Sequence, residues 1–188
     1  MKKIAILFSG TGSNFAYIME HLHQKKCEVV VALTNNPKAK GLEIAKKYDI
    51  PLVVIDSKNY QQREKFDEVV VSSLKKYVPD LTILAGFMRI LTPIFTTEIK
   101  AINLHPSLLP RHKGLNAIEK SYEDGFDKGG VTVHFVSSQL DGGQIILQKE
   151  LSKKGLTFQE YDNLIRSIEK EALVDAILKV LGEDNGNI

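Results

Sequence analysis

Residues 4–14 read Ile-Ala-Ile-Leu-Phe-Ser-Gly-Thr-Gly-Ser-Asn, an apolar run that leads directly into a loop with two glycines. A short, continuous apolar run of this kind is typical of a strand buried on both faces of a parallel sheet. The segment that follows, roughly Phe15–Lys25, has the length of a helix. A strand, a glycine loop and a helix in this order predict an α/β layer fold with a ligand site at the loop.

The same alternation continues through the first half of the chain. Short apolar runs, which we interpret as further buried strands, lie at Val29–Leu33, Leu52–Ile55, Leu81–Ala85 and Ile102–Leu104. Segments of helical length lie between some of them, at Ala39–Tyr48 and Tyr60–Tyr77. Strands separated by helices imply right-handed crossovers, so these strands are expected to be parallel.

The pattern changes in the second half. A short helix is expected near Asn116–Asp124, followed by strands at Val131–Val136 and Gln144–Glu150. The link between these strands, Ser137–Gly143, is too short for a crossover helix, so the strands are predicted to be antiparallel. A long helix, about Phe158–Leu181, follows.

The ends of the long helix have their own signals. Thr157 as N-cap with Glu160 three residues later forms a capping box. Gly182 is expected to terminate the helix, and the residues around Gly186 are expected to be frayed. The chain contains neither an internal repeat nor a linker. The prediction is one domain over residues 1–188, with a Rossmann-like open twisted sheet, mostly parallel with an antiparallel C-terminal strand pair, and helices on both faces.

The composition limits the partners. Against 25 basic residues stand 23 acidic ones, a formal net charge of +2, which argues against nucleic acid or an anionic membrane as the main partner. No apolar run has the length of a transmembrane helix. The single cysteine, Cys27, cannot form an intramolecular disulfide and is interpreted as a small packed residue. A cytoplasmic location is expected.

The glycine loop suits a phosphate rather than a dinucleotide. Gly10 and Gly12 allow tight turns, and Ser13 and Asn14 can cap the helix or donate hydrogen bonds. The dinucleotide fingerprint requires a third glycine where Phe15 stands, and the second strand is not followed by the acidic residue that binds a ribose. Two readings remain open here: a single-phosphate site and an ordinary glycine turn.

Asn103-Leu104-His105-Pro106 is the sharpest local feature of the second half. Asn103 and His105 are two residues apart on a strand and therefore project from the same face, at the carboxyl end where α/β sheets bind ligands. An amide donor beside an imidazole suits acyl transfer, with Asn103 donating to a developing oxyanion and His105 moving a proton. For the pair in isolation, a capped strand end with a solvated histidine is the slightly favoured explanation.

Asp141 lies in the turn between the last two strands, where Asp-Gly is an ordinary turn pair. The functional hypothesis is that the turn brings Asp141 against His105, where a carboxylate would favour the imidazolium and orient the ring. His134, in the middle of a strand, is interpreted as packed or supporting rather than catalytic. The spacing of histidines, cysteines and carboxylates predicts no metal site.

Four motifs occur together in an order and spacing that resembles the phosphoribosylglycinamide formyltransferases, within the family of folate-dependent formyltransferases. They lie at Ser9–Asn14, Ala85–Leu91, Asn103–Pro110 and Thr132–Val136, the last followed by Asp141-Gly142-Gly143. The resemblance runs over nearly the whole chain. It implies transfer of a formyl group from 10-formyltetrahydrofolate to the amine of glycinamide ribonucleotide in purine synthesis.

The resemblance also implies roles for single residues. Asn103, His105 and Asp141 match the catalytic group. The substrate-binding residues it implies are Thr11, Gly12, Ser13, Asn14 and Glu169. The residues it implies for folate binding are Arg63, Met88, Arg89, Ile90 and Leu91, with Asn103. On this basis residues 1–100 form a phosphate-binding half and residues 101–188 a catalytic and folate-binding half.

The sequence departs from the family pattern in two places. Lys170 follows Glu169 where the family usually has histidine, and Ile118 stands where many members have histidine. By analogy Leu109–Pro110 is a cis bond.

Three alternatives differ in the acceptor or in the chemistry. They are a formyltransferase for another amine, a formyltetrahydrofolate hydrolase, and a folate- or nucleotide-binding protein without catalysis. The expected partners are the two small-molecule substrates, without nucleic acid or membrane and without a metal, and the expected assembly is a monomer or homodimer.

Overall fold

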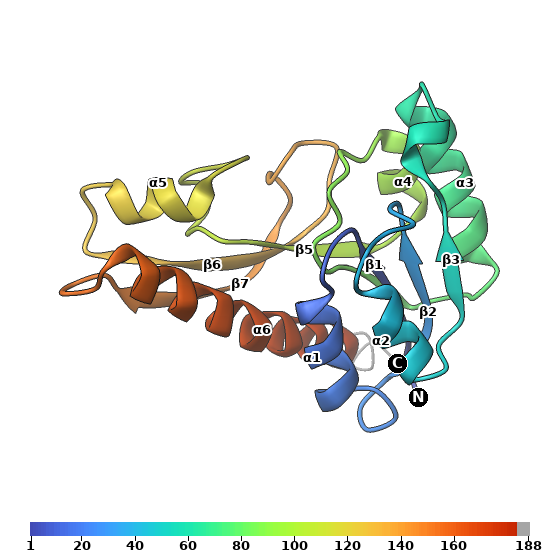
Figure 1. The fold of residues 1–188 in the computed structure, drawn as a ribbon, viewed down its shortest axis with the longest axis horizontal. Coiled ribbons are helices and arrows are strands. Elements are labelled where there is room, and N and C mark those ends of the chain that lie inside the picture. Colours follow the sequence, from blue (N-terminus) through green and yellow to red (C-terminus); the bar gives the residue numbers. More distant parts are fainter. Residues whose placement is uncertain (184–188) are drawn as a thin grey trace. The chain divides into compact units, whose positions relative to one another are not determined.

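The computed structural model describes residues 1–183. Its strands are β1 (Lys3–Phe8), β2 (Glu28–Thr34), β3 (Leu52–Val54), β4 (Leu81–Leu84), β5 (Ala101–His105), β6 (Lys128–Phe135) and β7 (Ile145–Ser152). Its α-helices are α1 (Ser13–His21), α2 (Leu42–Lys47), α3 (Arg63–Lys75), α4 (Pro93–Glu98), α5 (Ala117–Glu123) and α6 (Phe158–Glu183), with a 3₁₀ turn at Ser57–Asn59. Figure 1 shows the course of the chain through these elements.

Within the described residues the strands form a seven-stranded sheet in the order β3-β2-β1-β4-β5-β6-β7. β1 pairs in parallel with β2 and β4, and β2 pairs in parallel with β3. β6 and β7 are antiparallel, with Lys128 opposite Ser152. The predicted α/β class, mostly parallel with an antiparallel pair at the C-terminal end, is therefore confirmed.

The chain divides into two compact units, Met1–Ile102 and Asn103–Ile188. In the first unit β1 is the centre of the core, because Ile4 to Phe8 are all fully buried. β2 and β4 flank it with similarly apolar residues, and Phe15, Phe66 and Phe95 from the helices are fully buried too. The continuous apolar runs in the sequence correspond to this central position in a parallel sheet.

The second unit is built on the antiparallel pair. Helix α6 packs on β6 and β7, and α5 packs on α6. Tyr161 of α6 is the largest fully buried side chain in the described residues, and its hydroxyl hydrogen-bonds to Ser121 of α5 at 2.8 Å. Gly129 of β6 makes room for this ring, because a Cβ there would lie 1.9 Å from the Tyr161 hydroxyl oxygen.

The capping box predicted for the long helix is confirmed. The Thr157 N–H donates to Glu160 Oε2 at 2.7 Å, and the Glu160 N–H donates to Thr157 Oγ1 at 3.2 Å. The other end of the helix was predicted wrongly. Gly182 lies inside α6, which extends to Glu183, and the expected fraying around Gly186 falls outside the described residues.

Several other boundaries differ from the prediction. The first helix ends at His21 rather than near Lys25, and α2 is shorter than predicted at both ends. Helix α4 was not predicted; it spans six residues, too few for a helical period to show, and begins with Pro93 at a position that favours helix starts. The Leu109–Pro110 bond is cis, as the resemblance implied.

Candidate active site

Asn103 and His105 lie at the carboxyl end of β5, where the sequence placed them. Asn103 is half-buried and His105 is buried, with 6% of its surface exposed. The strand positions the two side chains on one face, and the loop 106–116 follows directly. This arrangement places an amide and an imidazole together at the end of a sheet strand.

Both ring nitrogens of His105 face oxygen acceptors. Nδ1 lies 3.4 Å from Oδ2 of Asp141, and Nε2 lies 2.7 Å from the backbone carbonyl oxygen of His112. The two contacts hold the His105 ring in one orientation between these oxygens. The structure brings His105 and Asp141 together, which local sequence alone could not show.

Asp141 is held in place by its turn. Its backbone lies in the left-handed region, with φ 50°, a conformation that aspartate tolerates better than most residues. The Gly114 N–H donates to Oδ2 at 2.9 Å. Burial opposes ionisation, but the His134 ring, the Gly114 N–H and positive charge on His105 outweigh it and hold the pKa of Asp141 below its ordinary value. The carboxylate is thus ionised at neutral pH.

His134 belongs to this cluster as the packed, supporting residue that the sequence indicated, and the structure adds that its partner is Asp141. It is 2% exposed on β6, and its Nε2 lies 3.7 Å from Oδ1 of Asp141. Nδ1 lies 2.9 Å from the carbonyl oxygen of Phe135. The available signal was a histidine in the interior of an otherwise apolar strand, which usually requires a polar partner. Asp141 thus faces two histidines rather than one.

The glycine loop of the first unit forms the N-terminus of α1. The N-cap is Gly12, in the left-handed region at φ 75°, so Ser13 and Asn14 lie in the first helical turn and do not cap the helix as proposed from the sequence. A side chain at Gly12 would clash, because a Cβ would lie 2.9 Å from the backbone of Gly41. The first turn of a helix has N–H groups without partners within the helix, and these can receive an anion.

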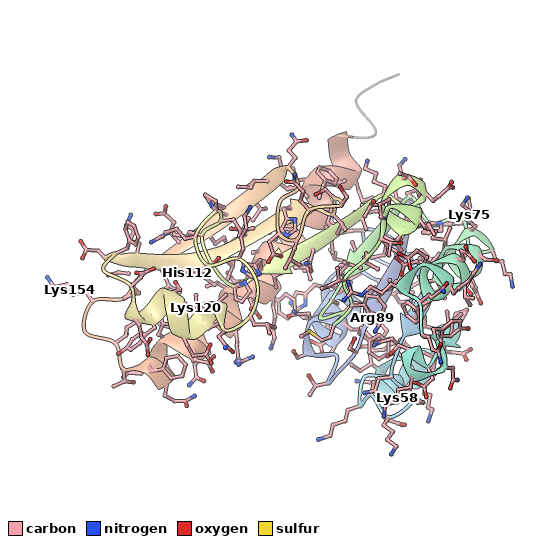
Figure 2. All side chains as sticks on the ribbon, turned by 90° about the horizontal axis from the view of Figure 1, so that it is seen from above. Lys58, Lys75, Arg89, His112, Lys120 and Lys154 are labelled. Atoms are coloured by element: carbon pink, nitrogen blue, oxygen red, sulfur yellow. The ribbon has the colours of Figure 1, made fainter. Side chains whose placement is uncertain are left out.

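The Met88–Leu91 stretch is anchored from both ends on α3. Phe87 stacks on Phe66 with ring centroids 6.4 Å apart, and the Arg89 guanidinium lies 4.8 Å from the centre of the Phe66 ring. Figure 2 labels Arg89 on this segment. At the other end, buried Asp67 accepts hydrogen bonds from the N–H and the hydroxyl of Thr92, both at 2.7 Å.

The anchors leave two apolar side chains of this stretch in solvent. Met88 is 70% exposed and Ile90 is 52% exposed. Ser9 connects the stretch to the end of β1, because its Oγ accepts from the Met88 N–H at 2.8 Å and donates to Asn35 at 2.5 Å. Exposed apolar side chains on an anchored backbone suit contact with a flat, largely apolar ligand.

The remaining residues implied by the resemblance are scattered. Thr11 and Arg63 are exposed, the latter as the first residue of α3. Glu169 is half-buried on α6, and burial outweighs the favourable charge of Arg166 and raises its pKa to about 7. The phosphate loop, Arg63 and Met88–Leu91 lie in the first unit, whereas Asn103, His105, Asp141 and Glu169 lie in the second.

In the described part of the chain, no helix is long and apolar enough to cross a membrane. Residues 1–183 also contain no group of three or more histidine, cysteine or carboxylate side chains placed to hold a metal ion.

Comparison with known proteins agrees with this geometry. The family model described as formyl transferase matches residues 2–177. The phosphoribosylglycinamide formyltransferase of Bacillus subtilis is 33% identical over 190 residues, which cover 98% of this chain and 97% of that protein. That of Haemophilus influenzae is 41% identical over 155 residues, 80% of this chain and 73% of that protein.

The solved structures give the same result. The crystal structure of phosphoribosylglycinamide formyltransferase from Campylobacter jejuni superposes with a TM-score of 0.93 at 48% identity, covering 96% of this chain and 97% of that one. The chain therefore belongs to the formyl transferase family. It is a one-carbon group transferase, and its strand β5 carries the amide of Asn103 and the imidazole of His105 at the carboxyl end.

Proposed function

We propose that this formyl transferase moves the formyl group of 10-formyltetrahydrofolate to the amine of glycinamide ribonucleotide, in de novo purine synthesis. The observation that carries the proposal is the imidazole of His105 held between two acceptors, with Asn103 on the same strand. The relatives named for this reaction cover the chain from end to end. The proteins that the chain resembles use a folate as the formyl donor. The donor is therefore assigned as a folate.

Binding is assigned to the first unit. The helix N-terminus formed by Gly12, Ser13 and Asn14, with Thr11, binds the phosphate of the ribonucleotide. Arg63 and Met88–Leu91 bind the folate, with the exposed Met88 and Ile90 against its rings and the Arg63 cation available to its carboxylates. Glu169 is assigned to the substrate ribose.

The chemistry is assigned to the second unit. The neutral amine attacks the formyl carbon, a C–N bond forms, and the carbonyl oxygen gains negative charge. Asn103 donates a hydrogen bond to that oxygen, and His105 donates a proton to it.

Collapse of the intermediate re-forms the carbonyl, which returns its proton to His105, and breaks the bond to the folate nitrogen. Asp141, directly or through water, takes a proton from the attacking amine and passes it to the departing folate nitrogen. Asp141 thereby returns to its ionised form and continues to orient the His105 ring.

Release of tetrahydrofolate, measured with and without glycinamide ribonucleotide, tests the proposal. Release that depends on the ribonucleotide supports it, and release in water alone would identify a hydrolase. Dephosphorylated glycinamide riboside is the matched control for the phosphate loop. It should react with a greatly raised KM, and an unchanged KM would remove the phosphate role of Gly12–Asn14.

A further inference from the structure

His112 has an unusual backbone. It lies in the left-handed region with φ 56°, an uncommon conformation that histidine adopts more often than most residues with a side chain. This conformation turns its carbonyl oxygen toward His105, which it meets 2.7 Å from Nε2. Figure 2 shows His112 on the loop before α5. A contact of the His112 ring with a fixed neighbour helps to hold this backbone.

Asp124, just after α5, provides that contact. Its Oδ2 lies 2.7 Å from Nε2 of His112, and Oδ1 accepts from Nζ of Lys153 at 2.5 Å. Arg111 Nη1 lies 3.6 Å from the same carboxylate. The pKa of Asp124 is lowered to about 2, because bonds from Lys153, His112 and the Phe126 N–H outweigh the effect of burial. Asp124 is therefore an ionised anchor.

Lys153 is fixed in turn. Only 8% of its side chain is exposed, and Nζ also donates to the carbonyl oxygen of Ser121 in the last turn of α5 at 2.6 Å. The backbone N–H of Lys153 donates to the carbonyl oxygen of Asp127 at 2.9 Å. The anchor thus joins the loop and the end of α5, which are neighbours in sequence, to the residue after β7, which is distant from both.

We propose that Asp124 is a positioning residue for His105, acting through His112. The Asp124–His112 pair holds the left-handed backbone, the backbone presents the carbonyl, and the carbonyl fixes the orientation of the His105 ring. The inference rests on the proposed function only where it concerns the rate. Neither Asp124 nor the side chain of His112 contacts the reacting atoms in this assignment.

The charged groups around the ring make the expected direction clear. His105 Nδ1 faces Asp141, and its Nε2 faces the His112 carbonyl oxygen. His134 in turn contacts Asp141. Asp141 still contacts Nδ1 when the carbonyl is lost, so the ring is held less firmly but keeps one of its two contacts. Arg111 and Lys153 face Asp124 and do not contact the His105 ring in the interactions described above.

Two variants break the pair in different ways. Asp124→Asn removes the charge, and His112→Asn removes the ring while keeping a residue that accepts positive φ. The second variant guards against misfolding, because it leaves the buried Lys153 paired with Asp124. Asp124→Glu is the conservative variant, and Lys128→Gln, which removes an exposed ion pair with Glu150, is the matched control.

Ring ¹⁵N NMR of the free protein is the direct readout. The protein has five histidines, and His105→Gln identifies the resonances of His105. In both breaking variants the ¹⁵Nε2 resonance of His105 should move from its wild-type position, because Nε2 loses the contact with the His112 carbonyl. Asp124→Glu should restore most of the wild-type position. Resonances of His105 that match the wild type in both variants would overturn the inference.

The rate supplies an independent arm. We expect kcat to fall roughly fivefold in both variants, with KM for each substrate within about twofold. An unchanged or raised kcat would show that the contact does not support catalysis and would overturn the inference. If the wild type does not transfer formyl groups at all, the proposed function fails, while the NMR result still decides the positioning role.

Discussion

The carboxyl ends of β1 and β5 differ in the atoms that they offer to a ligand. After β1 the chain offers backbone N–H groups at a helix start, arranged by Gly12 with its left-handed φ of 75°. After β5 it offers side chains, and His105 is oriented by contacts with Asp141 and the loop 106–116. A backbone site needs little beyond its own geometry, whereas a proton-transfer site requires a supporting network.

The largest expected effect comes from removing a side chain of the site after β5. Asn103→Ala should lower kcat by roughly 10²–10³, the usual loss for one oxyanion donor, with KM values little changed. Steady-state kinetics with both substrates measure this, and Asn163→Ala on the exposed part of α6 is the control. Turnover close to wild type in Asn103→Ala would exclude the oxyanion role.

The second prediction concerns the support of the folate stretch. Asp67→Ala leaves the N–H and hydroxyl of buried Thr92 without their acceptor and should cost about 1–3 kcal/mol in the free energy of unfolding. Because Thr92 anchors Met88–Leu91, KM for the folate should rise more than KM for the ribonucleotide. Urea denaturation and kinetics test this, with exposed Glu64→Ala on the same helix as control. Equal changes in the two KM values would contradict the assignment of this stretch to folate.

The third prediction tests the backbone site. Gly12→Ala forces a side chain into a left-handed conformation, at about 1–2 kcal/mol, and against the backbone of Gly41. Stability should fall, and KM for the ribonucleotide should rise while kcat is largely kept. Gly10→Ala is the matched control for stability, because nothing lies within 4 Å of a Cβ there. If both variants unfold at the same urea concentration, the strain argument is wrong.

The smallest expected effect depends on pH. The pKa of Glu169 is raised from 4.5 to about 7 by burial, so the folded state holds its proton more tightly than the unfolded state does. The resulting stabilisation is fully present below pH 4.5 and is lost as pH rises through about 7. Glu169→Gln should flatten this part of the stability profile in urea titrations at several pH values. A slope identical to that of the wild type would show that Glu169 does not titrate in this range.

Local sequence was sufficient for the order of strands and helices. Apolar runs such as Ile4–Phe8 can be stable only when both faces are covered, and the short link Ser137–Gly143 permits only an antiparallel pair. The capping box of Thr157 and Glu160 was predictable for the same reason, since its hydrogen bonds join residues three apart. The pairing of Asn103 and His105 on one strand face also follows from the period of a strand.

Contacts distant in sequence were beyond that reasoning. Three features depend on segments that meet only in the folded chain. They are the start of α1 after Gly12, the short α4 anchored through Thr92, and the approach of His134 to Asp141. A hydrogen bond between residues far apart leaves no periodic trace in either segment.

The sequence by itself determined the fold class and the residue types at the strand ends, because burial and strand period are local properties that repeat along the chain. Only the tertiary structure decided which acceptors surround His105. The carbonyl of His112 points to the ring because of a left-handed backbone, and that backbone is held by Asp124 beyond the next helix. The orientation and charge of an imidazole are set by atoms within a few ångströms of it, whatever their distance along the chain.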